Sequence, residues 1–211
     1  MTNLDFYFSP GCQWAWRTAL WARIVREQRP LNITWKLFSL ATVNKPHDPT
    51  GERFRNGIRA EKLLVATRRE HGNEGIERLY MALGDAFHGR KEPRLPETLL
   101  ACLRTAGLPE ALLQAAEEDR SVEEELMAEH QHAVDTLGAF GVPTLHLEGR
   151  ELGFFGPVVD PVPTGAEAVD LWDHTLWSLD KPYLWEFKRE RNYQPLPQPF
   201  IGPEPRAAAA V

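Results

Sequence analysis

The hydrophobic and polar positions at the start of the chain predict a strand, a helix and a second strand. Residues 4–8 form a short apolar run rich in aromatic side chains, and Ser-Pro-Gly at residues 9–11 ends it with turn-forming residues. Residues 32–37 alternate with the period of a strand. Between them lies one apolar helical stripe, ended by Pro30, which consists of Trp16, Leu20, Trp21, Ile24 and Val25. A connection of this length favours a right-handed parallel crossover.

The middle of the chain carries helical patterns only. From residue 44 to residue 137 strand signals vanish, and apolar residues recur at helical spacing between breaks rich in glycine, asparagine and proline. Proline at or just before a helix start, as at Pro96 and Pro109, suits the first helical turn. The expected helices cover residues 52–71, 74–87, 96–105, 110–116 and 122–137.

Strand patterns return in the last third of the chain. Residues 144–147 and 152–155 predict two strands, joined by a hairpin turn at Glu-Gly-Arg-Glu. A helix follows Gly165, and a further helical piece is expected over residues 183–190. From Gln194 the chain is rich in proline and closes with AAAAV, which predicts an extended strap or a disordered tail.

The order of these elements predicts an α/β protein with a thioredoxin fold. The strand-helix-strand unit at one end and the hairpin and helix at the other must share one sheet, so the helices between them form an all-helical insertion. We expect a discontinuous thioredoxin-like domain over residues 1–43 and 138–193, with an inserted helical domain over residues 44–137. A Pro- and Ala-rich tail would cover residues 194–211.

Composition and charge narrow the function classes. The 211 residues carry a formal net charge of −6 and no basic block, which argues against nucleic acid or an anionic membrane as the main partner. The N-terminus lacks the basic and apolar regions of a secretory signal, and no apolar run approaches the roughly 18 residues that span a bilayer. Two cysteines, Cys12 and Cys102, are far apart and do not form a disulfide framework. We therefore expect a reducing, cytoplasmic setting.

Cys12 has the most informative position in the sequence, just after the first strand and at the start of the first helix. Unpaired backbone N–H groups and the positive end of the helix dipole favour a thiolate there, and a lowered thiol pKa makes a nucleophile at neutral pH. Trp14 and Trp16 act in the opposite direction if they exclude water, since burial disfavours the charged form. The alternative is a small buried filler. The position of Cys12 at a strand-to-helix turn favours a reactive thiol over a cysteine that only fills space in the core.

A second feature is the segment Gly-Val-Pro-Thr at residues 141–144, which precedes the returning strand. Proline cannot donate to a sheet ladder, so it belongs at the start or edge of a strand. In this fold the position can hold a cis bond before Pro143, beside the thiol, which leaves the backbone groups of Val142 to meet an extended substrate. A trans proline that simply begins a strand is the alternative, and only about one X–Pro bond in twenty is cis. The surrounding order of elements favours the cis interpretation.

The sequence resembles a known family in four segments: FYFSPGCQWAWRTALW, GVPTLHLEGRELGFFGPV, LWDHTLWSL and YLWEFKRER. These segments resemble DsbA-like proteins typified by the actinobacterial mycothiol-dependent nitroreductases. More distantly, they are similar to 2-hydroxychromene-2-carboxylate isomerases and kappa-class glutathione transferases. The resemblance extends over residues 4–191. It matches Cys12 with the nucleophilic cysteine of the reductases and with the thiol-activating serine of the transferases, and Pro143 with the family's cis proline.

The resemblance also implies partners. A low-molecular-weight thiol, mycothiol or glutathione, is expected as co-substrate, with no tightly bound cofactor. A small electrophilic or disulfide substrate, a mycoredoxin-like reductant and a homodimer are further expectations. The candidate thiol- and substrate-binding residues are Gly11, Gln13, Trp14, Ala15, Val142, Pro143 and His88.

The chain departs from the family's dithiol pattern. The dithiol reductases carry Cys-Pro-Trp-Cys, whereas this chain has Cys-Gln-Trp-Ala at residues 12–15. A dithiol enzyme attacks with its first cysteine and releases the product with its second. With Ala15 in the second position, a mixed disulfide on Cys12 must wait for an external thiol, so ordinary disulfide oxidase activity is not expected. Gln13 replaces the proline and adds a hydrogen-bonding group beside the sulfur.

The remaining candidates are weaker. Cys102 lies among leucines on an amphipathic helix, which favours a packed core thiol over a resolving partner. His130 and His132 are two apart in a helical run and so point about 200° apart, and no metal-binding spacing accompanies them. His88, at a break in the insertion, is a candidate for lining a cleft, against the simpler interpretation of a surface or helix-end histidine.

Three hypotheses follow for function. The first is a monothiol oxidoreductase that uses Cys12 and a small thiol to reduce or conjugate electrophilic or disulfide substrates. The second is a glutathione-dependent isomerase or transferase, in which residue 12 only donates a hydrogen bond to the thiolate of the cofactor. The third is a binding protein that kept the fold and lost catalysis. Replacement of Cys12 by serine separates the first two, because only the redox enzyme needs the sulfur.

Overall fold

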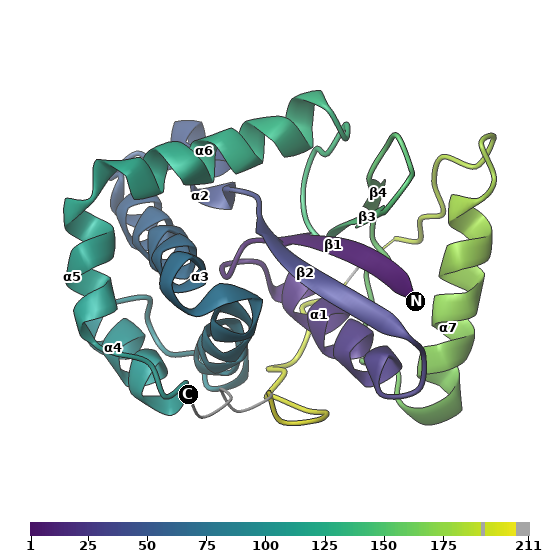
Figure 1. Ribbon diagram of the computed structural model, residues 1–211, viewed down its shortest axis with the longest axis horizontal. Helices are drawn as coiled ribbons and strands as arrows, with labels where there is room; N and C mark the ends of the chain where they lie inside the picture. Colours follow the sequence, from purple (N-terminus) through teal and green to yellow (C-terminus); the bar gives the residue numbers. More distant parts are fainter. Residues whose placement is uncertain (191–192, 206–211) are drawn as a thin grey trace.

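The computed structural model describes residues 1–190 and 193–205, and its elements follow the predicted order (Figure 1). The first unit consists of β1 (Thr2–Phe8), α1 (Gln13–Arg26) and β2 (Leu31–Leu37). The final unit consists of β3 (Thr144–Leu147), β4 (Phe154–Phe155) and α7 (Gly165–Leu179). Between them come α2 (Leu40–Asn44), η1 (Lys45–His47), α3 (Glu52–Gly84), the π-helical turn η2 (Asp85–Gly89), α4 (Pro96–Thr105), α5 (Ala111–Glu118) and α6 (Arg120–Asp135).

The two ends of the chain meet in one four-stranded sheet of order β2-β1-β3-β4. β1 pairs with β2 in parallel, as the crossover through α1 requires, and with β3 antiparallel. The aromatic rings of Trp21 on α1 and Trp172 on α7 lie 5.9 Å apart, and the indole N–H of Trp21 donates to the carbonyl of Ala168. The predicted α/β thioredoxin fold with inserted helices is confirmed.

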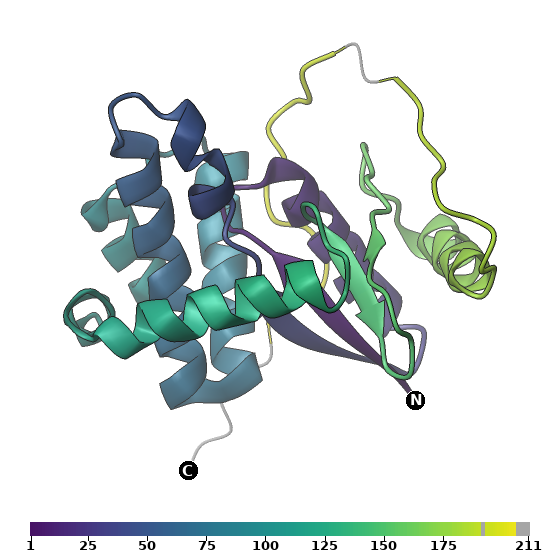
Figure 2. The ribbon, with the colours of Figure 1, turned by 90° about the horizontal axis from the view of Figure 1, so that it is seen from above.

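The helices of the insertion stand beside β2, on the side away from β3 and β4 (Figures 1 and 2). Side chains from this block satisfy backbone groups along the edge of β2. Asn73 accepts from the N–H of Trp35 at 2.9 Å and donates to the carbonyl of Ile33 at 2.7 Å, while Glu129 accepts from the N–H of Leu37 at 2.8 Å. An edge strand with open hydrogen-bonding groups is a template for aggregation, so these contacts protect the sheet as they attach the block.

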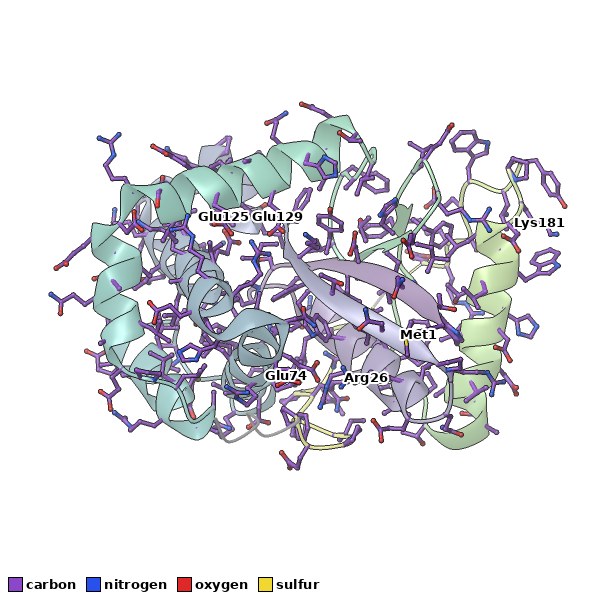
Figure 3. The ribbon with its side chains drawn as sticks, viewed as in Figure 1. Met1, Arg26, Glu74, Glu125, Glu129 and Lys181 are labelled. Carbon is purple, nitrogen blue, oxygen red and sulfur yellow. The ribbon has the colours of Figure 1, made fainter. Side chains whose placement is uncertain are left out.

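The α6 helix is held against α3 by charge. Figure 3 shows Glu125 and Glu129 on α6 turned towards α3, where the guanidinium of Arg68 bonds to both carboxylates at 2.8 Å. Arg69 adds a second contact to Glu125 at 2.6 Å. The acidic residues of α6 therefore hold two helices of the insertion together.

Several predicted boundaries need correction. Residues 52–84 form one helix in place of two, with the expected break reduced to a kink at Gly72, whose φ of 63° and ψ of −162° suit glycine. The predicted strand over residues 152–155 shortens to Phe154–Phe155, and α2 and η1 were not predicted. Residues 183–190 are not helical. Tyr183 and Phe187 are exposed there, and a short helix without a packed face is unstable.

Residues 193–205 run in an extended path across α1 and join it to η2, the turn that follows α3. The indole N–H of Trp16 donates to the carbonyl of Gln198 at 2.8 Å, and Arg17 donates to the carbonyl of Leu196 at 2.6 Å. The N–H of Gln198 in turn donates to the carbonyl of His88 at 2.9 Å. This segment explains how Arg17, with only 2% of its surface exposed, is accommodated on α1. The closing AAAAV lies outside the described residues.

Candidate functional site

Cys12 is the N-cap residue of α1, in extended conformation with φ −94° and ψ 111°. Its own N–H donates to the carbonyl of Ser9 at 3.0 Å, which closes the turn after β1. The N–H of Ala15 points at the Cys12 sulfur at 3.4 Å, as a capping donor does. The side chain is half-buried. The sulfur thus lies at the positive end of the helix dipole, in contact with one of the amides that a helix start leaves without an intrahelical partner.

The loop before β3 lies against the same sulfur. The peptide bond between Val142 and Pro143 is cis, as the family resemblance implied. The Cys12 thiol donates to the carbonyl of Val142 at 3.5 Å. We expected that carbonyl to be open to an extended substrate, but here it accepts from the thiol. A ligand that pairs with Val142 would replace this contact, and the thiol would lose its acceptor as the ligand arrives.

The residues next to Cys12 divide into buried and half-buried ones. Ala15 is fully buried, so the position that holds the second sulfur in a dithiol enzyme faces the core. Gly11, Gln13 and Trp14 are half-buried. The Arg17 guanidinium stands 5.7 Å from the centre of the Trp14 ring, which orients the ring by a cation–π contact.

His88 does not line a cleft and does not lie on the surface. It is 4% exposed within η2, and its Nε2 donates to the carbonyl of Pro10 at 2.9 Å. Burial lowers the pKa of the imidazole to about 4, so the ring is neutral at physiological pH. Its role is to hold the backbone two residues before Cys12. His88 is a helix-end histidine, as one interpretation of the sequence had it, but it is buried because η2 turns the ring inward onto the loop.

A cavity of about 660 Å³ adjoins the loop that carries Cys12. Pro10 and Gly11 form one wall, and the inserted helices form the others. Its lining is of mixed polarity: apolar side chains such as Leu40, Phe54 and Phe87 stand beside several polar and charged ones. Its volume lies in the range of small-molecule sites. Phe54, Ala60, Glu61, Phe87 and Arg94 are among the residues that line the cavity.

Glu61 is the buried charged candidate of this cavity, with 1% of its surface exposed. Its carboxyl accepts from the hydroxyl of Ser9 at 2.8 Å and from the hydroxyl of Ser39 at 2.6 Å. Among the described residues no cation forms an ion pair with it. Burial raises the pKa of Glu61 to about 7, although the hydrogen bonds from both serines oppose that shift.

Arg94 connects the cavity to the Cys12 loop. Its guanidinium donates to the carbonyl of Gly11 at 3.0 Å and stands 5.5 Å from the centre of the Phe87 ring. A Cβ added at Gly11 would lie 2.7 Å from the guanidinium, so glycine permits this approach. Burial lowers the pKa of Arg94, and the negative charges of Glu61 and Cys12 oppose that change. The positive charge of Arg94 therefore interacts with both the Glu61 carboxyl and the Cys12 thiol.

Cys102 is separate from this chemistry. It is 2% exposed on α4, its thiol donates to the carbonyl of Ala82 at 3.5 Å, and burial raises its pKa to about 12. The predicted packed core thiol is confirmed. No group of three or more metal-ligating side chains occurs in the described residues, nor does any helix there combine the length and apolar character needed to cross a bilayer.

Sequence reasoning missed Glu61, Arg94 and Ser9. Glu61 carried a usable signal, because it occupies the apolar stripe of its helix, one turn before Leu64 and Val65. A carboxyl on a buried stripe needs an explanation, since glutamate is almost never fully buried without a partner. Arg94 carried no such signal, because its loop has no periodic pattern.

Comparison with known proteins shows the family to which the chain belongs. A family described as Rv2466c-like, mycothiol-dependent nitroreductase Rv2466c, matches residues 11–189. The uncharacterized protein Rv2286c of Mycobacterium tuberculosis is 34% identical over 198 residues, a span that covers 91% of this chain and 84% of that protein. The resemblance to mycothiol-dependent nitroreductases that the sequence suggested is confirmed.

Solved structures agree on the fold. The cytosolic disulfide reductase DsbM from Pseudomonas aeruginosa with GSH has a TM-score of 0.58 at 15% identity, covering 83% of this chain and 99% of that one. A probable DsbA oxidoreductase, SCO1869 from Streptomyces coelicolor, has a TM-score of 0.57 at 16% identity, covering 86% and 92%. At such identities the likeness concerns the fold alone.

Proposed function

Because this chain belongs to the Rv2466c-like family of mycothiol-dependent nitroreductases, we propose that it is a thiol oxidoreductase that works with Cys12 as its one reactive sulfur. The observation that carries the proposal is the placement of Cys12. Its sulfur lies at the N-terminus of α1 against the Ala15 amide, faces the cis-proline loop, and has an alanine in the resolving position.

The proposed cycle has two half-reactions. In the first, the Cys12 thiolate attacks an electrophilic small molecule or a disulfide and forms a covalent adduct. In the second, a low-molecular-weight thiol attacks the adduct and releases Cys12. Mycothiol fits the family, and glutathione is the alternative co-substrate. A second cysteine at residue 15 would compete with this external thiol, and Ala15 removes that competition.

The surrounding residues have supporting roles in this proposal. Gly11, Gln13 and Trp14 border the sulfur, and Val142 and Pro143 present backbone to the incoming thiol or substrate. The cavity beside Gly11 would receive the electrophile. His88 takes a positioning role through Pro10. A cytoplasmic setting and a mycoredoxin-like reductant belong to the same proposal, because the cycle needs a supply of reduced thiol.

The test compares two cysteine variants. Wild-type protein exposed to oxidised glutathione or oxidised mycothiol should gain one thiol adduct on Cys12, seen by intact mass. Cys12→Ser should lose the adduct and lower thiol-dependent reduction by about 10³-fold or more. Cys102→Ala is the matched control and should behave as wild type, because that thiol is buried and un-ionised.

Retained turnover in Cys12→Ser would reject the proposal. That result would favour a glutathione-dependent isomerase or transferase, in which the hydroxyl of serine takes over the hydrogen bond to the thiolate of the cofactor. Equal inactivity of wild type and variant towards every thiol would instead favour a binding protein.

A further inference from the structure

The Glu61 carboxyl combines three features that a purely structural residue does not need together. It is buried, it has no ion pair among the described residues, and it lines the cavity next to the Cys12 loop. A buried ionised carboxylate without a cationic partner is costly, and burial favours its protonated form. Because its pKa is about 7, the Glu61 carboxyl can take up or release a proton near neutral pH.

The contacts of Glu61 lead to the backbone of the Cys12 turn. Ser9 donates its hydroxyl to the carboxyl, and the carbonyl of Ser9 accepts from the N–H of Cys12 at 3.0 Å. On the other side, Ser39 fixes the second carboxyl oxygen at 2.6 Å. The carboxyl is thus held by Ser9, which follows β1, and by Ser39, which caps α2, and it lines the cavity.

The Cys-x-x-Ala site creates a need for such a group. In a dithiol enzyme the second sulfur is built into the site, but here the resolving thiol arrives from solution as R–SH. A thiol is a poor nucleophile until its proton is removed, and an ordinary thiol with a pKa near 8.5 is only a few per cent ionised at pH 7. A base with a pKa near the working pH is the efficient solution.

We propose that Glu61 is the general base that deprotonates the external thiol in the second half-reaction. This inference rests on the proposed function, since it assumes an adduct on Cys12. In the step, R–SH gives its proton to the Glu61 carboxylate, and the resulting thiolate attacks the outer sulfur of the Cys12 mixed disulfide. The outer S–S bond forms between the two small thiols, the bond to Cys12 breaks, and Cys12 leaves as thiolate. The incoming sulfur is oxidised and Cys12 is reduced, while Glu61 holds the proton.

The charged groups around the cavity are compatible with this role. Arg94 from the 90–95 loop lies near both Glu61 and Cys12, and Arg53 from α3 also lines the cavity. The other charged or titratable lining groups are His47 and Asp48 from η1 and its end, and Lys91 and Glu92 from the loop after η2. The cations Arg53, Lys91 and Arg94 equal in number the carboxylates Asp48, Glu92 and ionised Glu61, so ionisation of the base leaves the lining without net charge.

The experiment measures resolution of a preformed adduct. The Cys12–glutathione mixed disulfide is mixed with reduced glutathione between pH 5.5 and 9.5, and its loss is followed by acid quench and intact mass. In the wild type the rate should level off near pH 7, where Glu61 is ionised. In Glu61→Gln, which keeps the shape and one of the two acceptor oxygens and presents an NH2 donor to the other serine hydroxyl, the rate at pH 7 should fall at least tenfold and continue to rise with the thiolate fraction.

Two further measurements separate base catalysis from a structural effect. Trifluoroethanethiol, a more acidic thiol that needs less help with ionisation, should narrow the gap between wild type and Glu61→Gln. Glu61→Asp, which keeps the acid group, should recover part of the rate and the levelling of the profile. Glu97→Gln, an exposed change on α4, is the matched control and should leave the profile unchanged.

Parallel pH profiles for wild type and Glu61→Gln would overturn this inference, as would an equal loss with both thiols at every pH. If Glu61→Gln does not fold, the wild-type profile decides: a rate that rises up to the pKa of glutathione itself, with no levelling near pH 7, overturns it. Failure of wild-type Cys12 to take any adduct would overturn the proposed function as well, so the two failures are distinguishable.

Discussion

Two buried glutamates of α3, Glu61 and Glu77, have opposite electrostatic environments. Glu77, 6% exposed near the end of the helix, accepts from Arg23 at 2.8 Å and from Arg26 at 2.7 Å, and also from the indole N–H of Trp35. These contacts outweigh burial and lower its pKa to about 2. Glu61, one third of the way along the same helix, accepts only from uncharged donors, the hydroxyls of Ser9 and Ser39 and the N–H of Ala41, and has a pKa of about 7.

The difference shows that burial by itself does not set the role of a carboxyl. At Glu77 two guanidinium groups compensate the lost hydration, and the ion pairs join α1 to α3. At Glu61 the partners are neutral, so the proton remains exchangeable in the physiological range. The first arrangement fixes the insertion against the thioredoxin helix, and the second leaves a titrating group at a cavity.

The largest expected effect comes from breaking the Glu77 cluster. Glu77→Ala leaves the fully buried Arg23 without its carboxylate, and loss of one partner of a buried pair costs about 3–5 kcal/mol. Urea unfolding at pH 7 measures the change in the free energy of unfolding. Glu74→Ala is the control, because Glu74 is exposed on the same helix (Figure 3) and should change stability by no more than about 0.5 kcal/mol. Equal effects in both variants would contradict the comparison.

The second prediction concerns the pH dependence of stability. The folded pKa of Glu61 is raised from 4.5 to about 7, so the folded state binds the extra proton and its contribution to stability is lost as pH rises. Relative to Glu61→Gln, the wild type should lose about 3 kcal/mol between pH 4.5 and 7 and stay level above that.

Glu77 should show the reverse sign. Its folded pKa lies below 4.5, so its contribution is present above pH 4.5 and is lost as pH falls towards 2. Urea unfolding of wild type, Glu61→Gln and Glu77→Gln across pH 3 to 8 gives both differences. The same slope for both glutamates would show that their environments do not differ as described.

The smallest effect should come from tuning Glu61. Ser39→Ala removes a hydrogen bond to the ionised carboxylate, so the pKa of Glu61 should rise by about half a unit to one unit. The levelling of the adduct-resolution rate should move to higher pH by the same amount. A matched change, Thr50→Ala, removes a hydroxyl that bonds to Asp48 at the surface and should leave the profile in place. A shift in the opposite direction in Ser39→Ala would contradict the assignment of the titration to Glu61.

The fold was largely predictable because its signals are local. The apolar aromatic run of β1, the period-2 pattern of β2, the apolar stripe of α1 and the Pro96 start of α4 each follow from neighbouring residues, and the order of the elements predicted the sheet. The failures are also local. Residues 183–190 have a helix-forming composition but no packed face. At Gly72 the sequence predicted a break between two helices, whereas the structure has one kinked helix.

The candidate site divides in the same way. Cys12, Ala15 and Pro143 could be singled out from the sequence, because they lie next to the predicted ends of strands and the start of a helix. Glu61 and Arg94 were not, because their partners are Ser9, Ser39 and Gly11, which are remote along the chain.

The sequence by itself determined the order of elements, the single sulfur at a helix start and the absence of a second sulfur at Ala15, because each is a property of adjacent residues. Only the tertiary structure decided which way His88 faces and which of two buried glutamates keeps its proton. A pKa depends on the charges and dipoles within a few ångströms, and those come from segments that meet only when the chain has folded.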